Sequence, residues 1–313
     1  MDLIFRAARL PRRGETLPGT SFVTHPGGKG GNQAAQVAHA GARAVVVGRV
    51  GRDGFGERLR ASLVDARVDT TFLAVDERDA TGVSTVLVGG DGDYASVIVP
   101  GASLNVEPGD IDLAADAIAG AAVVLLQLEI GHAAVTHAAK RGRASGAMVI
   151  LNAAPAPERP AVLPDELWHS VDVVVVNRGE AEMLLGDGAA DMLPCELAAR
   201  TRFCFNVAAV IVTLGGDGVV LDDAIGTLHE TAWPVDVLET IGAGDAFVGT
   251  LAAAVAGGTS LRGALALANA AGAMAVTRSD GYDALPTRSE VLRFLAERGL
   301  GQPPQPDYDT RLP

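Results

Sequence analysis

The sequence alternates short valine-rich runs with longer alanine-rich or amphipathic segments, and this alternation limits the folds open to the chain. Each valine-rich run is apolar at successive positions, as is typical of parallel strands covered by helices on both faces. The runs lie at residues 44–48, 123–128, 148–151, 171–176 and 210–214. Segments such as 54–66, 132–145 and 261–277 are long enough for helices. The pattern predicts an α/β fold with a central, mainly parallel sheet between helix layers.

A second pattern predicts a small β-sheet lid. Residues 81–88 and 94–99 flank the glycine-rich sequence GGDGD, which favours a β-hairpin. Prolines and glycines punctuate residues 3–23, as in extended chain with turns. We therefore expect lid pieces at about 3–23 and 81–101. Without an interdomain linker, residues 1–300 are expected to form a single domain, and the proline-rich residues 301–313 a disordered tail.

Composition excludes several classes of protein. The chain has 313 residues, with 25 Lys and Arg against 38 Asp and Glu, so its formal net charge is −13. That charge repels nucleic acid and anionic lipid, so we expect neither as a partner. No apolar run approaches the roughly 20 residues that a membrane span needs. The only cysteines, Cys195 and Cys204, have no CxxC spacing, which indicates a reduced, cytoplasmic protein.

The strongest local signal is ETIGAGDAF at residues 239–247. Gly242, Ala243 and Gly244 precede an alanine-rich run that should be a helix, so backbone N–H groups at its positive end would form an anion hole. Asp245 would lie in the first turn, where a carboxylate can take a proton from a hydroxyl nucleophile. The alternative is an ordinary glycine turn with Asp245 as the N-cap.

A second glycine-rich sequence, PGGKGGNQAA, also leads into a predicted helix. It is not a phosphate-binding P-loop, which needs Ser or Thr after the lysine, and it lacks the GxGxxG spacing of dinucleotide-binding turns. Its glycines allow close approach of a ligand, and Asn32 adds a donor and an acceptor. A polar ligand such as a sugar fits this sequence, and a structural turn is the alternative. The residues concerned are Gly28, Lys29, Gly30, Gly31 and Asn32.

Three weaker signals follow predicted strands. Asn177 and Glu180 have the spacing of a capping box, although they lie where α/β sheets place ligands. The sequence TLGGDG at residues 213–218 suggests a hairpin-type turn. Glu129 follows an apolar run and would either bind a sugar hydroxyl or face water. The histidines show no metal-ligand spacing, and no GxSxG hydrolase motif is present.

GGKGGNQA and ETIGAGDAF together make the chain similar to the ribokinase-like (PfkB-type) carbohydrate kinase family. Further matching motifs are GET at 14–16, GRVGRDGFG at 48–56, TGVS at 81–84, QLE at 127–129, NRGEAE at 177–182, TLGGDG at 213–218 and AVTR at 275–278. These cover most of the chain, and their order and spacing are specific. The GGKGxNQA form resembles the ribose-specific members most closely.

The resemblance implies a ribokinase-like fold whose β lid often forms a homodimer interface. It implies transfer of the ATP γ-phosphoryl group to the hydroxymethyl of D-ribose, with magnesium, Asp245 as base and residues 242–244 as anion hole. Another sugar or nucleoside, or a catalytically dead binding protein, are the alternatives. The implied sugar contacts are Asp2, Gly28, Lys29, Gly30, Gly31, Asn32, Glu129 and Asp245. The implied nucleotide contacts are Asn177, Thr213, Leu214, Gly215, Gly216, Asp217, Gly218, Gly244 and Asn269, with Glu180 assisting magnesium through water.

The chain departs from the family pattern at two places. Family members open with a strand ending in Gly-Ser-x-Asn-x-Asp, whereas this sequence begins at the last two positions, Met1 and Asp2. The family's first strand is therefore expected to be missing, because the start is misassigned or because the protein is a truncated relative. Since loss of a central strand exposes sheet edges, we expect Met1 to be an internal residue of the natural protein. The family's monovalent-cation site has Asp where this chain has Glu239 and usually Ser where it has Ala284. Its remaining potassium ligands would be carbonyls of Ile241, Ala275, Arg278 and Asp280.

Overall fold

Four of the valine-rich runs lie side by side in one parallel array. The computed structural model describes residues 1–90, 94–158, 162–279 and 281–299. Its largest sheet has the strand order β12-β11-β10-β9-β8-β7. The four runs are β7 (Val123–Leu126), β8 (Met148–Asn152), β9 (Val173–Asn177) and β10 (Ala209–Thr213), all parallel. The antiparallel hairpin of β11 (Val219–Asp223) and β12 (Gly226–Glu230) completes the sheet.

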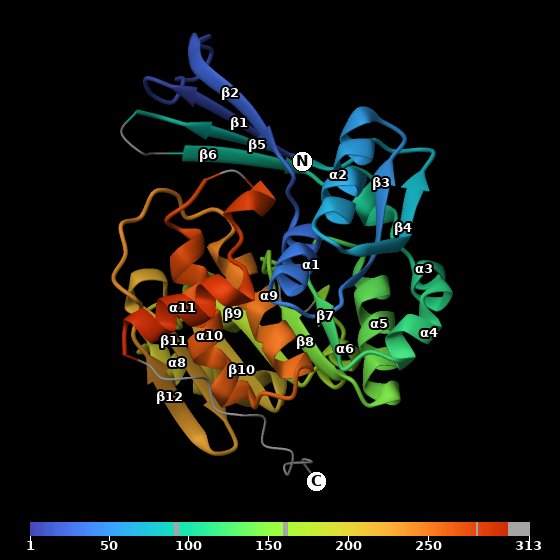
Figure 1. Cartoon of the computed structure of the whole chain (residues 1–313), viewed down its shortest axis with the longest axis vertical. Coiled ribbons are helices and arrows are strands. Elements are labelled where there is room, and N and C mark those ends of the chain that lie inside the picture. Colours follow the sequence, from blue (N-terminus) through green and yellow to red (C-terminus); the bar gives the residue numbers. More distant parts are fainter. Residues whose placement is uncertain (91–93, 159–161, 280, 300–313) are drawn as a thin grey trace.

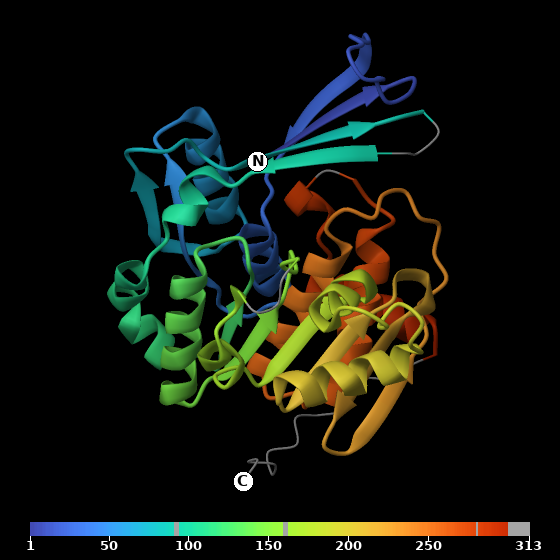
Figure 2. The same ribbon diagram turned by 180° about the vertical axis from the view of Figure 1, so that it is seen from behind.

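Helices cover both faces of this sheet, as predicted (Figures 1 and 2). On one face, α9 (Ala243–Ala256) and α10 (Leu261–Ala275) pack against side chains such as Ile150 and Ile211. On the other face, α5 (His132–Ser145), α7 (Arg178–Leu185) and α8 (Pro194–Phe205) enclose side chains such as Val174 and Val212. The N-terminal helix α1 (Lys29–His39) packs against α9, and α11 (Arg288–Glu297) packs against α10. Three short helices, α3 (Pro108–Leu113), α4 (Ala115–Ala119) and α6 (Asp165–Trp168), lie against α5.

The fifth run lies apart from this array. Strand β3 (Val45–Gly51) pairs in parallel with β4 (Asp69–Asp76), and α2 (Gly54–Asp65) connects them. Within the described part of the chain, the β3-β4 pair is a separate sheet, so β3 and β7 each have a single strand partner. The α/β architecture is confirmed. Its strands fall into two sheets, whereas the sequence predicted one sheet that lacks the family's first strand.

The predicted lid is a four-stranded sheet of order β2-β1-β5-β6. Strands β1 (Asp2–Ala7) and β2 (Gly19–His25) come from the first expected piece, and β5 (Val83–Val88) and β6 (Tyr94–Val99) form the expected hairpin. Figure 1 shows this sheet projecting beyond the helices above α1. The register places Asp2 beside Ser84 and Ser84 beside Ile98, so these residues share one face.

Some predictions fall on residues outside those described, namely residues 91–93 of the lid turn and the tail at 301–313. Among the helices of the described ranges, none has the length and apolar character that crossing a bilayer would require.

Candidate functional site

The N-terminus of α9 carries the strongest sequence signal, and its backbone is open. Gly242 is the N-cap and has a φ of 80°, in the left-handed region that favours glycine. A Cβ built at Gly242 or Gly244 would have no other atom within 4 Å. The N–H of Ala243 donates to the carbonyl oxygen of Thr240 at 3.4 Å, whereas the N–H groups of Gly244 and Asp245 have no partner among the described residues and lie at the positive end of the helix dipole.

Asp245 is held by side chains of α1. Its Oδ2 accepts a hydrogen bond from Nδ2 of Asn32 at 2.8 Å, and its Oδ1 accepts one from Nε2 of Gln33 at 2.9 Å. The alternative interpretation of Asp245 as the N-cap is wrong, because Gly242 occupies that position and the carboxylate is bound by α1. Only 7% of Asp245 is exposed.

Burial raises the pKa of Asp245, although the charge of Lys29 and the hydrogen bonds from Asn32 and Gln33 oppose the rise. A carboxyl whose pKa moves toward neutrality is a better general base, because it holds an abstracted proton more firmly. Its position in the first turn of α9 places this carboxylate next to the helix N-terminus.

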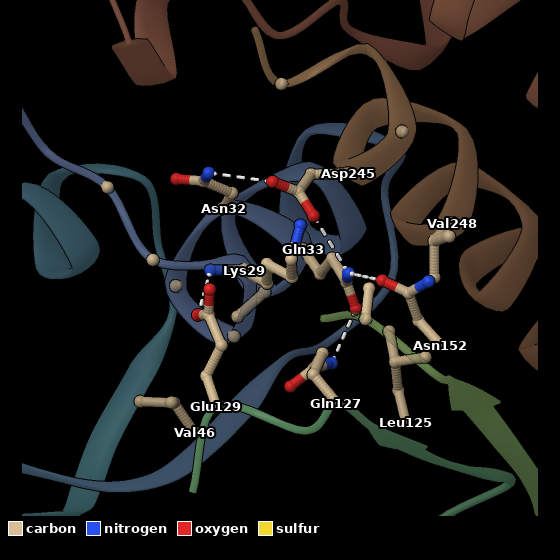
Figure 3. A pocket seen from close by; sticks show the side chains of 18 of the residues that line it. Lys29, Asn32, Gln33, Val46, Leu125, Gln127, Glu129, Asn152, Asp245 and Val248 are labelled. Atoms are coloured by element: carbon tan, nitrogen blue, oxygen red, sulfur yellow. Dashed lines mark hydrogen bonds between the residues drawn. The ribbon is translucent and has the colours of Figure 1, made fainter. Parts of the chain in front are cut away.

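Gln33, Gln127 and Asn152 were missed by the sequence reasoning, and they support Asp245 (Figure 3). Gln33 is fully buried, and its Nε2 also donates to Oδ1 of Asn152 at 2.9 Å. Its Oε1 accepts a hydrogen bond from Nε2 of Gln127. Helical spacing could have indicated Gln33, because it lies one turn after Lys29 and therefore on the same side of α1. We call Asn32, Gln33, Gln127, Asn152 and Asp245 the Asp245 cluster.

The glycine-rich sequence at the start of α1 lies against two carboxylates. A Cβ at Gly27 would lie 2.2 Å from Oδ2 of Asp2, so a larger residue there would displace the Asp2 carboxylate. Asp2 also accepts a hydrogen bond from Oγ of Ser84 at 2.5 Å, which ties the lid to this loop. The backbone N–H of Lys29 donates to Oε2 of Glu129 at 2.7 Å, and burial raises the pKa of Glu129.

One continuous cavity of about 1960 Å³ connects these groups with residues at the ends of β9 and β10. Asn177, Glu180 and Thr213 line it, and we call them the Asn177 end. The predicted capping box is confirmed: Oδ1 of Asn177 accepts from the N–H of Glu180, and Oε2 of Glu180 accepts from the N–H of Asn177, both at 2.8 Å. Burial raises the pKa of Glu180. The cavity is therefore lined by the carboxylate of Asp245, the N-terminus of α9 and the Asn177 end, and it has room for more than one small ligand.

The structure brings most predicted residues to this cavity and leaves others outside it. Asp2, Gly28, Lys29, Gly30, Gly31, Asn32, Glu129, Gly242, Gly244 and Asp245 line it together with the Asn177 end. Asn269 is instead buried in α10, where its Nδ2 donates to the carbonyl oxygen of Thr231 at 2.8 Å. Among described residues, Leu214, Gly215, Gly216, Asp217 and Gly218 form the turn between β10 and β11 and do not line the cavity.

The candidate monovalent-cation residues surround a second, small cavity of about 40 Å³. Glu239, Ile241, Ala275, Arg278 and Ala284 line it, beside Gly242 of the anion hole. Asp280 lies outside the described residues. Cation binding here stays a prediction.

Comparison with known proteins agrees with the motifs. The model of the pfkB family of carbohydrate kinases matches residues 1–288. The chain is 36% identical to a ribokinase of Mus musculus over 80% of this chain and 77% of the relative. It is 31% identical to a deoxyribokinase of Salmonella typhi over 80% of this chain and 81% of the relative. The solved structure of Arabidopsis thaliana ribokinase complexed with ribose and ATP has a TM-score of 0.82 at 29% identity, covering 94% of this chain and 95% of that one. The chain thus belongs to the pfkB family of carbohydrate kinases.

Proposed function

We propose that the protein phosphorylates D-ribose at its hydroxymethyl group, using ATP as the phosphoryl donor and yielding ribose 5-phosphate. The observation that carries this proposal is the position of Asp245, which is buried in the first turn of α9 and lines the large cavity. The relatives that are named for ribose, and the complex of one such relative with ribose and ATP, support the choice of substrates.

In the proposed reaction, Asp245 accepts the proton of the attacking hydroxyl. The amides of Asn32 and Gln33 fix the carboxylate, so that it need not reorganise as the proton arrives. Asp2, Asn32 and Glu129 border the same part of the cavity and offer oxygen and amide groups to the other sugar hydroxyls. The hydroxyl oxygen attacks the γ-phosphorus, and ADP leaves in line with it.

The part of the cavity lined by the N-terminus of α9 and the Asn177 end suits a nucleotide. The N–H groups after Gly242 can stabilise negative charge on the transferring phosphoryl group, and no Cβ at Gly244 blocks its approach. Glu180, with Asn177 and Thr213 beside it, supplies the carboxylate that would hold magnesium through water. Bound magnesium neutralises phosphate charge.

We also propose a homodimer through the lid. Phe22 and Val97 are 55% and 67% exposed. The lid register places them on the face opposite to Asp2 and Ile98, which line the cavity. An exposed apolar sheet face is typical of a protein interface. Sedimentation analysis should give twice the chain mass, and Val97→Lys should give monomers, whereas a monomeric wild-type protein would contradict the dimer.

The substrate is tested by ADP release from the purified protein with magnesium and potassium. The sugar panel contains D-ribose, 2-deoxyribose, fructose and a nucleoside, and Asp245→Asn is the control. We expect the wild-type protein to have its highest kcat/KM with ribose, and Asp245→Asn to lose this activity. A preference for 2-deoxyribose would keep the mechanism and move the activity toward that of the deoxyribokinase relative. Binding of ribose and ATP without turnover would instead favour a catalytically dead binding protein.

A further inference from the structure

Tyr282 is a buried polar residue that the proposed mechanism does not use. It belongs to the short 3-10 helix η4 (Gly281–Ala284), which follows α10, and 6% of it is exposed. Within the described part of the chain its hydroxyl has no hydrogen-bond partner. A buried hydroxyl without a partner is costly, so such a group in a folded protein calls for a partner that binds there.

The sequence leaves room for this hydroxyl. A Cβ built at Gly31 would lie 2.5 Å from Oη of Tyr282, closer than atoms can pack. Gly31 lies in the first turn of α1, next to Asn32, which binds Asp245. A side chain at position 31 would therefore displace the phenol from this turn.

The position of Tyr282 relates it to the sugar side of the cavity. It lines the same cavity as Asp2, Asn32 and Asp245. Burial raises the pKa of Tyr282, and the charges of Asp245 and Asp2 raise it further, so the phenol keeps its proton and can donate. A neutral donor among carboxylates complements a sugar hydroxyl, which accepts from the phenol and donates to a carboxylate.

We infer that the hydroxyl of Tyr282 donates a hydrogen bond to a hydroxyl of the acceptor sugar, and that this contact discriminates between sugars. The inference rests on the proposed function, because it assigns an additional specificity contact in the same site. A site built to bind a hydroxyl rejects analogues that lack it, since its own polar group then stays buried without a partner.

The test is Tyr282→Phe, which removes the hydroxyl and keeps the ring. Steady-state kinetics would use ribose and ribose analogues that each lack one hydroxyl. For ribose we expect KM to rise about tenfold, the effect of losing one such hydrogen bond, while kcat and the KM for ATP stay within twofold. One deoxy analogue should have the same KM with both proteins, because it already lacks the contacted hydroxyl.

Thr201→Val is the matched control. Thr201 is also buried, but its Oγ1 donates to the carbonyl oxygen of Leu197 at 2.8 Å within α8, outside the cavity. It should lower Tm and leave every KM unchanged. Tyr282→Phe should raise the KM for ribose without lowering Tm, because the hydroxyl has no partner to lose within the described chain.

Two results would overturn the inference. Unchanged KM for ribose in Tyr282→Phe would mean that the hydroxyl makes no contact with the bound sugar. An equal rise in KM for ribose and every analogue, together with a lower Tm, would mean that Tyr282 only supports the fold. Failure of the proposed function gives a different result, since the wild-type protein would then turn over no sugar in the panel.

Discussion

The Asp245 cluster and the Asn177 end occupy one cavity but are built in different ways. The hydrogen bonds of the cluster join residues 94 to 213 positions apart, and Gln33 and Asp245 are buried. At the Asn177 end, Asn177 and Glu180 bind each other across one helical turn. The first arrangement depends on the whole fold and fixes a charge in a buried place. The second is local and leaves its groups available to a ligand.

The sharpest test of this difference is Asp245→Asn, which keeps the shape of the side chain and removes the base. We expect kcat to fall by about 10³-fold, within the range for loss of a general base. The KM for ATP should change only a few fold, because the substitution leaves the Asn177 end, where we propose that the nucleotide binds, unchanged. Initial rates of ADP release at varied ATP measure both, and a kcat close to wild type would remove Asp245 from the mechanism.

At the Asn177 end, Glu180→Gln should weaken the apparent affinity for magnesium. The magnesium concentration that gives half the maximal rate should rise by about 10-fold to 100-fold, as on loss of an outer ligand of a metal. The substitution removes the charge and keeps an oxygen to accept the N–H of Asn177. The KM for the sugar should not change. Titration of magnesium at saturating ribose measures the effect.

Glu182→Gln is the control for Glu180→Gln, because Glu182 lies on the same helix, pairs with Arg178 at 2.8 Å and does not line the cavity. If Glu180→Gln changed the KM for the sugar and left the magnesium requirement normal, the Asn177 end and the Asp245 cluster would not act on separate ligands.

Within the Asp245 cluster, Gln33→Met removes a donor to the carboxylate and keeps the volume of the side chain. Because a hydrogen bond to the charged form lowers a pKa, its loss should raise the pKa of Asp245 further. The acid limb of the kcat–pH profile should therefore move to higher pH, so rates on that limb fall.

Gln36→Met is a close control for Gln33→Met. Gln36 is as fully buried on the same helix, but its Nε2 donates to Oγ1 of Thr250 and the carbonyl oxygen of Pro286. Both variants should lose stability, and only Gln33→Met should move the acid limb. If the acid limb moved in both variants, the cause would be a general destabilisation of α1 and not the lost hydrogen bond to Asp245.

The same contrast explains what the sequence could predict. The capping box of Asn177 and Glu180 and the turn after β10 follow from spacing within a few residues, and both are confirmed. The fold class and the lid follow from strand and turn patterns. Gln33, Gln127 and Asn152 were missed because their partners are chosen by packing between distant segments, which spacing does not encode.

The smallest effect that we predict concerns stability, and it tests whether the charge of Asp245 is held at a cost. The pKa of Asp245 is raised in the folded protein, so between the unfolded and folded values the folded state binds more protons. Stability contributed by this group therefore falls as pH rises through that interval.

Asp245→Asn carries no charge and should melt a few degrees above the wild type at pH 7. The difference should vanish below the ordinary aspartate pKa of about 4. Thermal denaturation from pH 4 to 8 measures it. A variant that melts below the wild type at every pH would mean that the hydrogen bonds from Asn32 and Gln33 outweigh the cost of burying the carboxylate, and that the cluster stabilises the fold as well as the base.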